Sequence, residues 1–189
     1  LSIKNAISHH GYNAIVTRDK KEIQSASHII LPGVGAFPAA MKKLQKFELI
    51  DPILEIKKKN KSYLLGICLG MQLLFSESEE FELTNGLNLI NGKIKKLDKF
   101  CLNFNYKLPN IGWRNCKVDT NNKIKILKGI SSIDQFYFVH SYGLKNFDDG
   151  INISESKYKD ISFPAVINFK NIYGCQFHPE KSGPQGLKI

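Results

Sequence analysis

The pattern of hydrophobic and polar positions changes near residue 84. Before this point, short apolar runs alternate with segments whose apolar residues recur every three or four positions. The runs predict strands over 12–17, 27–31 and 63–67, and the periodic segments predict helices over 2–10, 19–24, 37–47, 52–59 and 71–75. Alternating strands and helices favour an open, mostly parallel, doubly wound α/β sheet of the flavodoxin-like kind.

After residue 84 the apolar runs are short and few long helices separate them. They predict strands over 87–90, 92–97, 114–118, 135–139, 165–169 and 172–177. The last two runs flank Lys170-Asn171, which predicts a hairpin. We therefore expect an antiparallel β extension of the same domain. Because no linker rich in Pro, Gly or Ser separates the halves, residues 1–189 are predicted to form a single domain.

The two ends of the sequence do not complete this pattern. The first predicted element is a helix without a preceding strand, and the last residues, Gly186–Ile189, resemble the start of an element. We expect the domain to be truncated at both ends, lacking a first strand and a C-terminal helix.

A cysteine lies where an apolar strand passes into a helix, in the order Gly66-Ile-Cys68-Leu-Gly70. This spacing is typical of a nucleophile elbow, in which glycines without a Cβ permit a tight, strained turn. The amides at the start of the helix favour a thiolate, and the N–H of Leu69 faces an oxyanion formed at the carbon that is attacked. The alternative is that Cys68 is a small buried hydrophobic residue.

A nucleophile needs a base and a group that orients the base, and His178-Pro179-Glu180 offers both. In an extended backbone, residues two apart point to the same side, so Glu180 can reach the imidazole of His178. The prediction is a Cys68–His178–Glu180 triad. The alternative is a His and a Glu in a surface loop.

Three weaker signals predict groups around this triad. The turn Pro32-Gly-Val34-Gly35 follows a strand, and the amide of Val34 or Gly35 is a candidate second oxyanion donor, although an ordinary turn is also possible. Gln72 lies one helical turn past the cysteine. Ser141 and Tyr142 end another strand. Gly35, Gln72, Ser141 and Tyr142 are therefore the candidate contacts for a polar substrate.

Composition narrows the class of protein further. The net charge is +10, but only Arg18 and Arg114 among 27 basic residues are arginine, and the run Lys57-Lys58-Lys59 with Lys61 is typical of a solvated helix end. We therefore expect no nucleic-acid partner. The absence of a long apolar run argues against a membrane partner. Four cysteines without metal-ligand spacing, at positions 68, 101, 116 and 175, indicate reduced thiols in a cytoplasmic protein without a metal or a cofactor.

These motifs together resemble the class I glutamine amidotransferases of the Cys-His-Glu type. The order of four segments narrows the resemblance to the glutaminase subunits of imidazole glycerol phosphate synthase: 32–37, 64–75, 139–142 and 178–183. One departure is Asn110, where this family more often has His, and another is the missing first strand. Neither departure changes the triad.

The resemblance implies that the chain hydrolyses glutamine to glutamate and ammonia without a cofactor. It also implies a heterodimer with a (β/α)₈-barrel cyclase, which uses the ammonia to make imidazole glycerol phosphate and an aminoimidazole carboxamide ribotide in histidine biosynthesis. Trp113 and Lys181 match positions near that interface, although both could be ordinary core and surface residues. Two alternatives remain open, namely a stand-alone cysteine hydrolase such as a γ-glutamyl peptidase and a catalytically silent scaffold protein.

Overall fold

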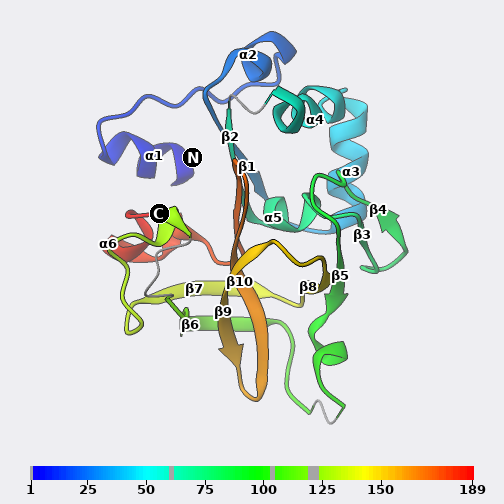
Figure 1. The fold of residues 1–189 in the computed structure, drawn as a ribbon, viewed down its shortest axis with the longest axis vertical. Helices are drawn as coiled ribbons and strands as arrows, with labels where there is room; N and C mark the ends of the chain where they lie inside the picture. Colours follow the sequence, from blue (N-terminus) through cyan, green and yellow to red (C-terminus); the bar gives the residue numbers. More distant parts are fainter. Residues whose placement is uncertain (1, 60–61, 103–104, 119–123) are drawn as a thin grey trace.

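The computed structural model describes residues 2–59, 62–102, 105–118 and 124–189, which are built around a five-stranded sheet (Figure 1). The strand order is β1 (His28–Gly33), β2 (Tyr63–Cys68), β11 (Ile172–Cys175), β10 (Ile161–Phe169) and β9 (Asn152–Tyr158). Strand β2 pairs in parallel with both β1 and β11, whereas β10 pairs antiparallel with β11 and β9. Only β10 therefore runs against the other four strands, and the predicted mostly parallel α/β sheet is confirmed.

Apolar side chains cover both faces of this sheet. Because side chains alternate along a strand, Leu64 joins one buried cluster while Leu65 and Ile67 join the other. Three helices pack on the first face: α3 (Phe37–Lys46), α4 (Ile50–Lys59) and α5 (Leu69–Leu73). Figure 1 shows α1 (Ser2–His9) and α6 (Gly183–Gly186) on the other side of the sheet. The sheet is thus covered from both sides, as a doubly wound fold requires.

The predicted antiparallel extension is also present. A four-stranded sheet has the order β4 (Thr84–Asn85), β3 (Glu77–Ser78), β5 (Gly92–Lys96) and β8 (Tyr142–Phe147), and β6 (Asn110–Asn115) pairs antiparallel with β7 (Gln135–His140). The remaining elements are short: α2 (Lys20–Ser25), η1 (Leu97–Phe100), η2 (Lys125–Leu127) and η3 (Pro179–Lys181). Lys170 adopts φ +55° between β10 and β11, so the predicted hairpin is confirmed.

Two predicted strands are wrong. Residues 12–17 form no ladder with any described strand, and Tyr12, Ile15 and Val16 are exposed, because an apolar run becomes a strand only beside a partner. Leu87, Leu89 and Ile90 are buried, but residues 87–90 run as an irregular segment. The amide of Leu87 donates to Leu73 O (2.8 Å), at the C-terminal end of α5, which leaves this amide no role in a ladder.

Other predictions differ in their boundaries. The strand expected over 114–118 is β6, which begins earlier, at Asn110, and β8 and β9 were not predicted. Helix α2 is capped by Asp19, whose carboxylate accepts hydrogen bonds from the amides of Lys21 and Glu22. Helix α4 ends at Lys59, but the side chains of the lysine run, and residue 61, lie outside the described part of the chain.

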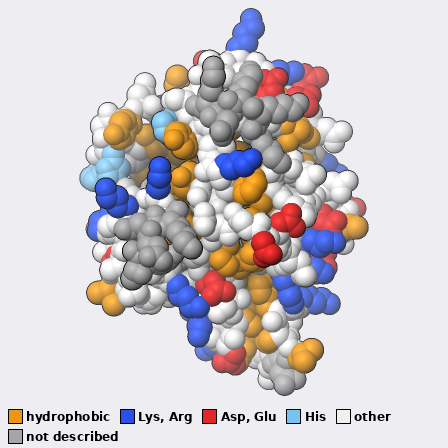
Figure 2. Space-filling view, in the orientation of Figure 1, with side chains coloured by type: hydrophobic (Ala, Val, Ile, Leu, Met, Phe, Trp, Pro, Cys, Tyr) orange, Lys and Arg blue, Asp and Glu red, His pale blue; other side chains and the backbone are white. Residues whose placement is uncertain are grey.

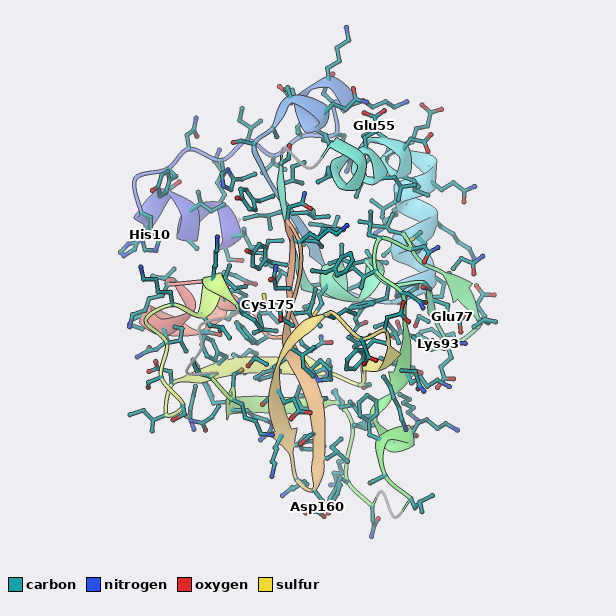
Figure 3. The ribbon with its side chains drawn as sticks, viewed as in Figure 1. His10, Glu55, Glu77, Lys93, Asp160 and Cys175 are labelled. Carbon is teal, nitrogen blue, oxygen red and sulfur yellow. The ribbon has the colours of Figure 1, made fainter. Side chains whose placement is uncertain are left out.

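Basic side chains do not form one continuous surface on the face shown in Figure 2, where Lys and Arg are mixed with Asp and Glu. Several lysines are paired. The Nζ of Lys93 lies 2.8 Å from Glu77 Oε1 across β5 and β3 (Figure 3). None of the helices among the described residues combines the length and the hydrophobicity needed to cross a membrane.

Candidate active site

Cys68 is the last residue of β2 and directly precedes α5. Its backbone has φ +54° and ψ −111°, a conformation that a residue with a side chain adopts only under strain. The flanking glycines permit the close approach that the turn needs. A Cβ on Gly66 would lie 2.7 Å from backbone atoms of Met71, and a Cβ on Gly70 would lie 1.8 Å from Leu31 O. The predicted elbow geometry is therefore present.

The imidazole of His178 contacts the carboxylate of Glu180, as predicted. His178 Nδ1 lies 2.9 Å from Glu180 Oε1, and both side chains are buried. The reason given from the sequence was wrong, however, because this segment is not extended. His178 precedes the 3₁₀ turn η3, and this turn folds Glu180 back toward the ring.

The same imidazole also hydrogen-bonds the side chain of Cys68. Since Nδ1 faces Glu180, Nε2 is the ring nitrogen that is available to the sulfur of Cys68. The hydrogen bond with Cys68, followed by the one with Glu180, raises the pKa of His178 from 6.5 to about 9, although burial opposes this rise. Burial would raise the pKa of Glu180, but its hydrogen bonds to His178 and to its own amide, with the nearby positive charges, lower it overall. At neutral pH the ring is therefore a cation beside the Glu180 carboxylate.

Backbone contacts hold the imidazole in place. The amide of His178 donates to Tyr137 O on β7 (3.0 Å). The hydroxyl of Ser182 donates to His178 O (2.6 Å) and accepts from the amide of Tyr137 (3.0 Å). Because β11 is parallel to β2, their carboxyl ends lie at one edge of the sheet, and this brings together residues 68 and 178.

The predicted oxyanion residues directly follow β1 or Cys68. Gly33, the last residue of β1, pairs in register with Cys68, so Val34 and Gly35 follow at the same edge of the sheet. Gly35 has φ +96°, which favours glycine, and the side chain of Val34 is 82% exposed. Leu69 is the first residue of α5 and is buried.

The predicted substrate contacts are brought together as well. Gln72 is buried, and its Nε2 donates to Tyr142 O (2.9 Å) and to Gln176 Oε1 (3.0 Å). Both hydrogens of this amide are therefore used within the protein, and only its oxygen is left for a ligand. Ser141 and Tyr142 are half-buried between β7 and β8.

The structure adds groups that the sequence reasoning missed. Gln176 is fully buried, and its Nε2 lies 3.7 Å from Cys68 Sγ. A polar residue inside the apolar run 172–177 was the signal that could have identified it. The carboxylate of Glu80 accepts from the amide of Phe37 (2.7 Å), just after the Val34–Gly35 turn, and its charge acts on Tyr142.

Trp113 lies beside Tyr137, and Lys181 lies in η3. Trp113 is half-exposed on β6, and its ring meets that of Tyr137 edge-on at 5.8 Å, whereas Lys181 is exposed in η3. Two other histidines, His10 and His28, are distant from this edge. Figure 3 shows His10 near α1, away from Cys175 at the centre, and His28 begins β1 at the opposite edge of the sheet.

No metal site accompanies these residues in the described ranges, where no group of three or more His, Cys, Asp or Glu side chains is arranged to hold an ion. The groups that the site does bring together are the Cys68 side chain, the His178 imidazole and the Glu180 carboxylate.

A fold and a site of this kind define a class of protein, and a comparison of the sequence with family models identifies the class. The family model described as "Glutamine amidotransferase class-I" matches residues 2–189. The chain belongs to the class-I glutamine amidotransferase family, and the predicted enzyme class is confirmed.

Within the class, the curated relatives indicate one kind of protein, each being named "Imidazole glycerol phosphate synthase subunit HisH". The relative from Caldanaerobacter subterraneus subsp. tengcongensis is 42% identical over 188 residues, spanning 100% of this chain and 88% of its own length. Relatives from Bacillus cereus and Lactococcus lactis subsp. lactis are 43% and 39% identical over all of this chain and 85% and 89% of their own lengths. These matches confirm the predicted relationship to this synthase subunit.

Solved structures show the same fold at low sequence identity. A crystal structure of a glutamine amidotransferase has a TM-score of 0.75 at 17% identity, covering 98% of this chain and 88% of its own. A glutamine amidotransferase from Thermotoga maritima has a TM-score of 0.61 at 17% identity, covering 95% of this chain and 70% of its own. Both likenesses concern the fold alone.

Proposed function

We propose that this chain hydrolyses the side-chain amide of glutamine, with Cys68 as nucleophile, His178 as acid and base, and Glu180 as the group that orients His178. The observation that carries the proposal is the unbroken contact from the Glu180 carboxylate through the imidazole to the sulfur. Such an arrangement has the roles that nucleophilic amide cleavage needs.

The resting protonation state suits the first step. With the pKa of His178 raised to about 9, the proton resides on the imidazole at neutral pH, and Cys68 attacks the amide carbon as a thiolate. The imidazolium then gives its proton to the departing nitrogen, so ammonia leaves and a thioester remains. Neutral His178 next takes a proton from water, which attacks the thioester and releases glutamate, and the thiolate is restored.

Neighbouring groups stabilise and hold the reacting molecule in this proposal. The amides of Leu69 and of the Val34–Gly35 turn receive the oxyanion. Ser141 and Tyr142, together with Gly35 and the free oxygen of Gln72, line the place of the glutamine side chain. Glutamine also carries an ammonium group, which needs an acceptor.

We assign Glu80 to that ammonium. Its carboxylate lies at the end of the turn that carries Gly35, and it acts on Tyr142 electrostatically. A carboxylate so close to two proposed substrate contacts supplies the charge that a free amino acid requires.

A partner completes the proposal. The relatives are named as subunits of imidazole glycerol phosphate synthase, and ammonia is useful only if a second site consumes it. We propose that a cyclase subunit binds around the exposed side chains of Trp113 and Lys181 and receives the ammonia. It would make imidazole glycerol phosphate and an aminoimidazole carboxamide ribotide for histidine biosynthesis, in the cytoplasm.

Labelling with an electrophilic glutamine analogue, followed by peptide mapping, tests this function. We expect the label on Cys68, formed faster when the cyclase and its acceptor substrate are present. Cys68→Ala removes the label, and Cys101→Ser, a matched change at a half-exposed cysteine, leaves it unchanged. Equal labelling and full ammonia release without the cyclase would indicate a stand-alone hydrolase. No labelling under any condition would indicate a silent scaffold.

A further inference from the structure

A buried amide lies beside the sulfur of Cys68, in addition to the imidazole of His178. Gln176 has no exposed surface, and its Nε2 lies 3.7 Å from Cys68 Sγ. Three other groups face this sulfur: the imidazole of His178, Val139 O at 3.9 Å, and Cys175, whose thiol interacts with it electrostatically. Of these four groups, Gln176 and His178 are left to donate a hydrogen bond to a thiolate, because Val139 O only accepts and the Cys175 thiol donates to Gly66 O (3.9 Å).

Neighbouring hydrogen bonds determine which end of the Gln176 amide faces the sulfur. Gln72 Nε2 donates to Gln176 Oε1 (3.0 Å), so the oxygen is engaged and the N–H group points to Cys68. The second hydrogen of Gln72 goes to Tyr142 O (2.9 Å). The amide of Gln72 therefore cannot flip without losing both acceptors.

A second set of hydrogen bonds fixes the backbone carbonyl of Tyr142, to which Gln72 donates. Arg114 can only donate, and its Nε lies 2.6 Å from Asn110 Oδ1, so Nδ2 of Asn110 donates to Nε2 of His140 (2.9 Å). His140 must then carry its proton on Nδ1, which donates to Tyr142 O (2.8 Å). Burial lowers the pKa of His140 to about 4, so this ring is neutral at pH 7, as the chain of donors requires.

We propose that Gln176 is a positioning residue for the glutaminase reaction proposed above: its N–H group, oriented by Gln72, holds the Cys68 sulfur and stabilises it as a thiolate. The bond acts twice in a turnover. It raises the thiolate population before attack, and it stabilises the same thiolate when the thioester is hydrolysed and the sulfur leaves. A hydrogen bond to a charged group in a buried site is stronger than one between neutral groups.

Alkylation of Cys68 by iodoacetamide measures thiolate formation without requiring glutamine. The rate at the Cys68 peptide is followed by mass spectrometry against pH in the unaltered chain, in Gln176→Met and in Gln176→Glu. Methionine removes the donor at similar size without adding charge, and glutamate keeps the shape but removes the donor. Gln135→Met and Gln135→Glu make the same changes at an exposed position on β7 and serve as controls.

We expect the midpoint of the alkylation profile to rise by about one pH unit in Gln176→Met and by more in Gln176→Glu. Thermal unfolding of each variant verifies that it is folded, and the Gln135 variants keep the original midpoint. A rise in Gln176→Glu alone would come from the added charge and would overturn the proposed donor. An unchanged midpoint in both folded variants would also overturn it.

A failure of the positioning role can be distinguished from a failure of the proposed glutaminase function. If the unaltered chain releases ammonia from glutamine, alone or with the cyclase, but the Gln176 variants keep the original alkylation midpoint, the positioning role fails and the glutaminase proposal stands. If the midpoints shift but glutamine is never hydrolysed, the positioning role stands and the function fails.

Discussion

Replacing Glu180 with Gln tests the electrostatic argument most directly, because it removes the charge beside His178 while keeping the shape. The folded protein raises the pKa of His178 from 6.5 to about 9, which corresponds to roughly 3 kcal/mol in favour of the protonated ring. The hydrogen bond with Cys68 is the largest cause and the one with Glu180 is the next. We therefore expect Glu180→Gln to lower the pKa of His178 by about 1 to 2 pH units, the effect of losing one close opposite charge.

The assay is a pH titration of the His178 ring followed by NMR, with chemical unfolding at several pH values. A raised histidine pKa contributes stability that is full below about pH 6.5 and is lost as the pH rises through about 9. The stability difference between the original chain and Glu180→Gln should therefore be largest near pH 6 and shrink toward pH 9. Turnover of glutamine should fall by about 10²–10⁴, because the imidazole loses its orienting partner.

The control for this variant is Glu22→Gln, the same change in the exposed helix α2, which should leave the titration and the turnover unaltered. The reasoning is refuted if His178 still titrates near pH 9 in Glu180→Gln, because the carboxylate would then contribute nothing to the charge on the ring.

Three further predictions concern other parts of the site. Gly70→Ala should lower the free energy of unfolding by about 3 kcal/mol or more, because its Cβ would lie 1.8 Å from Leu31 O; a urea unfolding midpoint equal to that of the original chain would contradict this packing. Cys68→Ser should abolish analogue labelling and reduce turnover by at least about 10³, because a neutral hydroxyl replaces the thiolate; residual turnover above this level would indicate another nucleophile. Asn110→Asp should raise the pKa of His140 from about 4 to above 6.5, because a carboxylate would accept from Nε2 where Asn110 now donates; an NMR titration showing His140 still neutral near pH 6 would exclude the proposed polarity.

Local sequence was sufficient wherever a contact joins near neighbours in the chain. The glycines two positions from Cys68 indicated the elbow because their requirement, a missing Cβ, is local. The pairing of His178 with Glu180 was also predictable, although the turn that produces it was not. The failures have a common reason: the apolar run 12–17 has no described strand beside it, and 87–90 fills the core without a ladder.

By itself, the sequence determined the alternating helices and strands of the first half apart from 12–17, the sharp turn at Cys68, and the residues able to act as nucleophile, base and orienting carboxylate. Only the tertiary structure decided that Gln176 faces the sulfur, and that Gln72 and His140, which Asn110 orients, both donate to the carbonyl of Tyr142. A hydrogen bond between residues a hundred positions apart depends on how the strands are ordered and aligned in the sheet. The periodicity of apolar residues along the chain does not predict that alignment.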